Sequence, residues 1–185
     1  IASGAIKLTG GSINDNKAVA DMTESTNKLN KLSTGLGGGV YVASGATLII
    51  EAASSEIITG NEALYGGGIY TAGITTLTSG VIRGNVATTM SSNIDSSTSS
   101  FQKGKEARGG GVFVAGKLEV VGGSISGNIA DFGGGVYLDG TLVMNAGNIN
   151  SNQAYWGAGL YANSREATLS GGSISYNVTL YEVEM

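Results

Sequence analysis

The sequence predicts an all-β fold in which short parallel strands stack along one axis. An Ile-x-x-Asn motif recurs six times in the 185 residues, and a block of three small residues, an aliphatic residue and an aromatic residue follows five of the copies. Uninterrupted copies of the motif are 24 or 25 residues apart. This period holds three short strands and three corners, and it is too short for a strand-helix-strand unit. The repeats therefore predict a single-stranded parallel β-helix of about six coils, each strand lying in register on its counterpart one coil away.

The first strand of each repeat carries the isoleucine, and its neighbours are mostly small or polar, as Ser124 and Ser126 are beside Ile125. Alternation of this kind places isoleucine inside and its neighbours outside. We expect a structural ladder of buried isoleucines at Ile13, Ile58, Ile82, Ile125, Ile149 and Ile174.

The asparagine of the motif stands at the corner that follows this strand. Asparagine tolerates left-handed corners, and its amide can bond both the turn backbone and the equivalent asparagine of the next coil. We interpret the column as a structural ladder and keep ligand binding as the less favoured alternative. Its members are Asn16, Asn61, Asn85, Asn128, Asn152 and Asn177.

The glycine block supplies positive φ angles or close backbone approach at the next corner. Its copies occupy residues 37–41, 66–70, 109–113, 133–137 and 157–161. A phosphate-binding loop is not expected, because no Gly-Lys-Ser/Thr follows and no strand-loop-helix pattern surrounds the block.

An aromatic column follows the glycines on the second strand. If Val40 and Val42 point inward, strand alternation turns Tyr41 outward, together with its equivalents. Such a ladder either binds a sugar chain or is covered by inserted loops, and we favour the covering. The column comprises Tyr41, Tyr70, Phe113, Tyr137 and Tyr161.

A third, more variable strand precedes the next isoleucine, as in residues 118–120. Two insertions, 19–36 and 88–108, fall at the corner between asparagine and glycines. Asparagine to third glycine takes 7 residues in the uninterrupted copies, but 23 from Asn16 and 26 from Asn85. A smaller insertion lies near 52–56. Repeat proteins often place insertions on the face that meets a partner, and the alternative is a tolerated surface loop without a role.

Residues 1–185 form one domain in this interpretation. Residues 1–5 align with 42–46, so the chain begins within a coil, and neither end carries a recognisable cap. Because solenoids need capping units, we expect a segment of a longer solenoid, or ends that meet other subunits.

Composition excludes several kinds of chemistry. The chain has 32 glycines but no Pro, Cys or His, only 13% charged residues and a net charge of −4. Zinc and haem sites, Ser-His-Asp and Cys-His catalysis, and a basic nucleic-acid surface are therefore not expected. Asp15, Asp131 and Asp139 occupy different columns, and no calcium-binding nonapeptide occurs. We predict no catalytic residue, no metal and no cofactor, and no apolar run long enough for membrane insertion.

The Ile-x-x-Asn motif followed by Gly-Gly-Gly-Val/Ile-Tyr resembles the repeats of chlamydial polymorphic outer-membrane proteins, in which Phe-x-x-Asn precedes Gly-Gly-Ala and an aliphatic residue. The resemblance runs from Ile13 to Asn177, with Ile in place of Phe and usually a third Gly in place of Ala. Similar repeats occur in large surface proteins of gut bacteria, methanogenic archaea and some anaerobic protists. It implies a right-handed β-helix exposed at the cell surface or secreted, acting as an adhesin or stalk.

We therefore expect a non-enzymatic extracellular segment, an adhesin or structural surface rod, whose corner insertions contact other subunits or a protein or glycan of a host or cell surface. The alternative is a protein that binds a polysaccharide along the aromatic column or cleaves it as a lyase or glycoside hydrolase.

Overall fold

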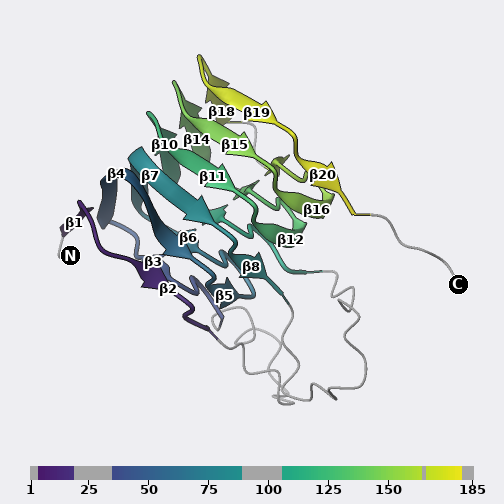
Figure 1. Cartoon of the computed structure of the whole chain (residues 1–185), viewed down its shortest axis with the longest axis horizontal. Helices are drawn as coiled ribbons and strands as arrows, with labels where there is room; N and C mark the ends of the chain where they lie inside the picture. The colour runs from purple at the N-terminus through teal and green to yellow at the C-terminus, as the bar shows by residue number, and fades with distance from the viewer. Residues whose placement is uncertain (1–3, 19–34, 89–105, 164–165, 181–185) are drawn as a thin grey trace, which may run out of the picture.

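The computed structural model describes residues 4–18, 35–88, 106–163 and 166–180, except for the side chains of residues 54 and 55. All regular structure in these ranges consists of β-strands, and every strand pair is parallel. The predicted all-β class with parallel strands is confirmed for this part of the chain. Figure 1 shows the strands in rows, from β1 and β2 near the N-terminus to β18, β19 and β20 near the C-terminus.

The largest sheet, which we call sheet A, has ten strands and holds the isoleucine strand and the variable strand of each repeat. Its strands are β1 (Ala5–Leu8), β2 (Ile13–Asn14), β4 (Thr47–Thr59), β7 (Ile74–Arg83), β10 (Lys117–Val120), β11 (Ser124–Ser126), β14 (Thr141–Met144), β15 (Asn148–Asn150), β18 (Glu166–Leu169) and β19 (Ser173–Ser175).

Two five-stranded sheets complete the fold. Sheet B follows the asparagine corner and contains β5 (Glu62–Ala63), β8 (Val86–Ala87), β12 (Ile129–Phe132), β16 (Gln153–Trp156) and β20 (Val178–Thr179). Sheet C follows the glycines and contains β3 (Val40–Val42), β6 (Ile69–Thr71), β9 (Val112–Val114), β13 (Val136–Leu138) and β17 (Leu160–Ala162).

The register joins equivalent residues of successive repeats. Ile125, for example, pairs with Ile82 on one side and Ile149 on the other. The six asparagines thus mark six levels of one stack, and we call each contact between neighbouring levels a junction. One strand departs from this regularity, because the pairing of β4 with β7 shifts register between Ile50 and Ile58, at the small insertion.

The main core lies between the sheets and contains the inward side chains of sheets A and C. Ile58, Ile82, Ile125 and Ile149 are fully buried there. The end members of the ladder are less covered: Ile13 is half-buried and Ile174 is exposed. Burial of such a side chain contributes about 1.5–3 kcal/mol, so the column is a major source of stability.

The two corner insertions fall mostly outside the described residues. Only residues 35–36 of the first range and residues 88 and 106–108 of the second are described. No helix in the parts of the chain that the structure describes is long and apolar enough to cross a membrane.

Candidate functional site

The asparagine column forms a continuous hydrogen-bonded ladder inside the stack. At every junction the backbone N–H and the side-chain Nδ2 of one asparagine donate to Oδ1 of the next, over 2.9–3.0 Å. Nδ2 also donates to the isoleucine carbonyl of the preceding level, as from Asn128 to Ile82 at 3.1 Å. The four middle asparagines are fully buried. Their polar groups are engaged within the stack, which is the structural arrangement that we favoured.

The glycine corner brings the backbones of neighbouring levels very close together. Gly66 has φ +67°, and a Cβ on Gly67 would stand 2.5 Å from the carbonyl oxygen of Val86. A side chain on Gly68 would press against the buried amide of Asn85, with 3.0 Å between the atoms. In the copies with three glycines the corner is therefore closed to side chains, whereas the last copy has Ala158 at the middle position. The residues on either side of the corner carry the large groups.

The aromatic column stands on the face of sheet C that is turned away from the main core. Val136 and Leu138 lie in the main core, whereas Tyr137 between them belongs to a second apolar cluster. The rings of the column stack at every step, with centroids 5.0–5.3 Å apart and planes within 15°. This spacing follows that of parallel strands, about 4.8 Å, so the strand register itself stacks the rings.

A second column, which sequence reasoning missed, runs along the other side of the glycine corner. It consists of the residue immediately before each glycine triplet, and parallel bridges hold its members in register. A large residue before every triplet was the signal that could have revealed it. The second column comprises Leu36, Tyr65, Arg108, Phe132 and Trp156.

Side chains of the second column contact the ring of the aromatic column that lies one level closer to the C-terminus. Tyr65 tilts against Phe113 at 5.5 Å, and Phe132 meets Tyr161 edge-on at 5.2 Å. The guanidinium carbon of Arg108 lies 5.3 Å from the ring centre of Tyr137. These contacts bury Phe113 and Tyr137, whereas Tyr41 at the start of its column is 52% exposed. Side chains of the second column thus cover the rings of Phe113 and Tyr137. Two members of the second column, Leu36 and Arg108, belong to the predicted insertion ranges.

The buried phenols of this cluster resist ionisation. Burial, the largest effect, raises the pKa of Tyr65, Tyr70 and Tyr137 above the usual value near 10. The positive charge of Arg108 opposes this for Tyr65 and Tyr137 by lowering the pKa.

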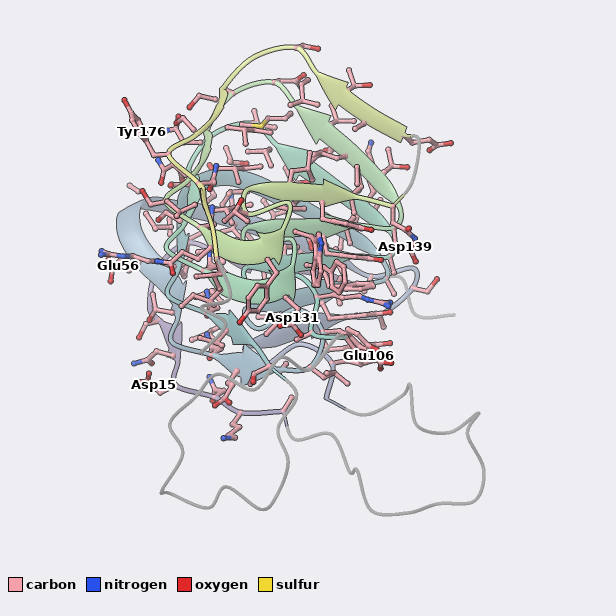
Figure 2. The ribbon with its side chains drawn as sticks, turned by 90° about the vertical axis from the view of Figure 1, so that its right-hand side faces the viewer. Asp15, Glu56, Glu106, Asp131, Asp139 and Tyr176 are labelled. Atoms are coloured by element: carbon pink, nitrogen blue, oxygen red, sulfur yellow. The ribbon has the colours of Figure 1, made fainter. Side chains whose placement is uncertain are left out.

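Asp131 fastens the end of the second insertion to sheet B. Its carboxylate is buried, and Oδ2 accepts a hydrogen bond of 3.1 Å from the backbone N–H of Ala107. The Ala107 carbonyl accepts bonds from the N–H groups of Asp131 and Phe132. Figure 2 shows Asp139 and Glu106 on one side of the molecule, Asp15 on the other, and Asp131 between them. Within the described ranges, no three acidic side chains gather as a metal site.

The exposed parts of the two columns form the candidate contact surface. Tyr41 opens one end of the aromatic column, and Trp156, stacked on Phe132 at 4.5 Å, is 40% exposed near the other end. Flat apolar rings with polar edges suit the faces of sugars or the side chains of a protein partner. Comparisons with family models, with curated proteins and with solved structures each found no match.

Proposed function

We propose that this chain is a segment of a single-stranded right-handed parallel β-helix that serves outside the cell as an adhesin or structural surface rod. The observation that carries the proposal is the register: the same columns continue across all five junctions, from Ile13 to Ile174. Six levels of strands span roughly 30 Å along the axis. The resemblance to polymorphic outer-membrane protein repeats supports the handedness and the extracellular location.

Stacked levels suit a rod for a physical reason. Each added level buries one more isoleucine and extends the asparagine ladder, so length increases without any new kind of core. Residues that bind a partner can then lie in insertions, because each repeat tolerates additional residues at one corner.

Contacts with a protein or glycan partner are proposed to lie at the corner insertions, 19–36 and 88–108. The described flanks support this placement. Leu36 packs into the second apolar cluster, and Ala107 is held by Asp131, so both insertions are anchored to the stack beside the exposed rings.

Adhesion of coated beads tests the proposal. Deleting residues 19–34 restores the 7-residue spacing found from Asn61 to Gly68, because Asn16 to Gly39 spans 23 residues. Beads carrying the full chain should bind an epithelial cell layer, and beads carrying the deletion should lose most binding while the circular dichroism spectrum is unchanged. A control that replaces the same residues by an equally long Gly/Ser segment should also lose binding. Undiminished adhesion of both variants, or turnover of acidic polysaccharides by the chain, contradicts the proposal.

Carbohydrate binding through the aromatic column is the second candidate, favoured by the exposed ring of Tyr41 at the open end of the stack. We expect Tyr41→Ala and Trp156→Ala to abolish signals on a glycan array. Tyr176→Ala, at a residue 86% exposed and outside both columns, is the matched control. Equal glycan signals for all three variants, or no glycan signal from the unaltered chain, remove this candidate.

A further inference from the structure

Two buried threonines lie in the middle of the stack, where the core is otherwise apolar. Thr71 ends β6 and Thr75 is the second residue of β7, on either side of a corner formed by Ala72 and Gly73. Both threonines are fully buried. Within the ranges that the structure describes, neither side-chain oxygen Oγ1 has a hydrogen-bond partner. Because buried hydroxyls without a partner are costly and rare in folded proteins, this pair is a candidate binding site.

The side chains above and below the two threonines offer no polar partner. Their neighbours in register are all buried aliphatic residues of the main core: Val42 and Val114 beside Thr71, and Leu48 and Leu118 beside Thr75. Aliphatic side chains neither donate nor accept hydrogen bonds. The hydroxyls are therefore surrounded by carbon along the axis of the stack.

The backbone carbonyls at this corner are already engaged. The carbonyl of Thr71 accepts hydrogen bonds of 2.9 Å from the N–H groups of Ala115 and Gly116. The carbonyl of Val42, one level closer to the N-terminus, likewise accepts two bonds, of 2.8 and 3.2 Å, from the corner between β6 and β7. A carbonyl oxygen has two lone pairs, so neither of these carbonyls can also accept a bond from a threonine hydroxyl.

The residue types at the two positions also provide space for a small molecule. The positions equivalent to Thr75 in other levels hold leucine, at Leu48, Leu118 and Leu142. Threonine is shorter than leucine and has one non-hydrogen atom fewer, whereas at position 71 it has the shape of the valines beside it. The volume that leucine would add is comparable to that of one water molecule, about 30 Å³ in the liquid.

We propose that the corner between β6 and β7 holds one internal water molecule, hydrogen-bonded to Oγ1 of both Thr71 and Thr75. Both side chains point into the core from the two sides of one corner. The equivalent pair one level away, Val114 and Leu118, has the same spacing and belongs to a single core cluster. A water molecule can accept from one hydroxyl and donate to the other, so both buried oxygens gain a partner. The inference goes beyond the proposed function and does not depend on it, because it concerns only the interior of the stack.

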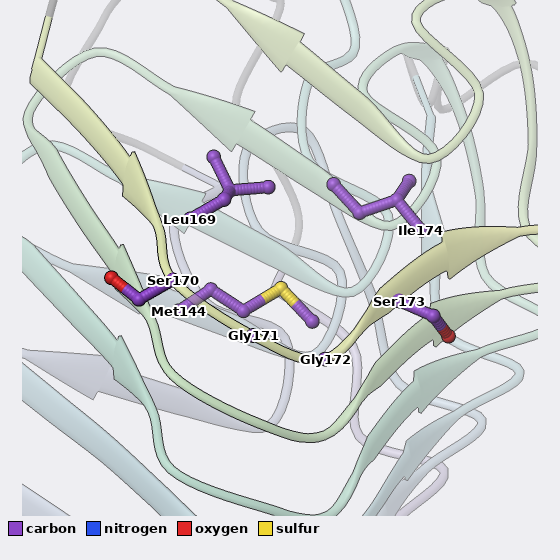
Figure 3. Close-up of a pocket in the computed structure, with 7 residues that line it drawn as sticks. All are labelled: Met144, Leu169, Ser170, Gly171, Gly172, Ser173 and Ile174. Carbon is purple, nitrogen blue, oxygen red and sulfur yellow. The ribbon is translucent and has the colours of Figure 1, made fainter.

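This site differs from the hollow beside Met144, Leu169 and Ile174 (Figure 3). The hollow has a volume of about 270 Å³, and Leu169 at its border is 50% exposed. Water in such a hollow exchanges freely with the solvent. Water held between two fully buried threonines leaves only when the surrounding levels open, so its residence time is long.

A crystal structure of the full 185-residue chain, at a resolution that shows ordered water, tests the site directly. We expect a density peak at about 2.8 Å from the hydroxyl oxygens of both Thr71 and Thr75. Any other arrangement overturns the inference, for example a direct hydrogen bond between the two hydroxyls, or bonds from both to backbone carbonyls with no peak between them.

Oxygen-17 relaxation dispersion of water tests the same site in solution, because it counts the long-lived internal waters. Replacing both threonines together, Thr71→Val and Thr75→Val, keeps the side-chain shapes but removes both hydroxyls, so the count should fall by one. Thr78→Val, at an exposed residue of the same strand, is the matched control and should leave the count unchanged. An unchanged count in the double variant overturns the inference, and if that variant does not fold, the crystal structure of the unaltered chain decides.

Two substitutions at position 75 separate the hydroxyl from the space. Thr75→Ser keeps the hydroxyl and should retain the long-lived water. Thr75→Leu introduces the residue of the neighbouring levels, fills the space and should expel the water. Loss of the water from Thr75→Ser, or its retention in Thr75→Leu, overturns the inference.

Discussion

At the scale of single residues, the buried asparagine side chain forms hydrogen bonds with the levels on both sides of it. Its Oδ1 accepts two hydrogen bonds and its Nδ2 donates two, so one short side chain satisfies groups of three levels. An ionised aspartate can accept hydrogen bonds but has no N–H group to donate, and leucine can neither donate nor accept. The chemistry of the amide therefore explains why the same residue type stands at all six levels.

Asn128→Ala tests this role. The substitution leaves the buried N–H of Asn85 and the carbonyl of Ile82 without partners, so we expect the free energy of unfolding to fall by about 3 kcal/mol. Urea unfolding followed by circular dichroism measures the change. Asn145→Ala, at an exposed corner, should change it by less than about 0.5 kcal/mol. Similar losses for both variants would contradict an essential ladder.

At the scale of elements, the glycine corner separates two columns with different environments. The aromatic column is stacked by strand register, and the second column closes over it one level ahead. The two columns thus behave as one layer outside the main core, and burial of phenols in that layer makes it sensitive to alkaline pH.

The raised pKa values of Tyr65, Tyr70 and Tyr137 set the sign of this sensitivity. The unfolded chain loses the phenolic protons near pH 10, while the folded chain holds them to higher pH, so stability falls as pH rises above about 10. Thermal unfolding at stepwise pH should show the decline. Replacing all three by Phe should shift the decline to higher pH, and an unchanged profile would contradict the assignment.

The strands and the isoleucine positions follow from the sequence because a period of 24 or 25 residues and local alternation both indicate the same faces. The second column does not follow so directly. Leu36, Arg108 and Trp156 differ in chemistry, and only the register shows that they share one line. The slip within β4 also depends on how the three residues by which β4 exceeds β7 are accommodated, which no local pattern specifies.

At the scale of the whole molecule, stability comes from repetition along one axis. The middle levels have neighbours on both sides and bury their isoleucines completely, while the ends leave Ile13 and Ile174 partly uncovered. The same difference appears in the aromatic column, where Tyr41 is open and Tyr137 is closed. Within the isoleucine and aromatic columns, the exposed members therefore lie near the ends of the described stack.

The asparagine ladder also gives the stack a sense of direction. The hydrogen bonds between asparagine side chains all run the same way, from Nδ2 of one level to Oδ1 of the next level toward the C-terminus, so each bond polarises the next. The two ends of the ladder consequently differ: Oδ1 of Asn61 accepts from Asn16 at the first junction, and Nδ2 of Asn152 donates to Asn177 at the last. Reversing a single amide would set donor against donor at one junction and acceptor against acceptor at the next, so the whole column must share one direction.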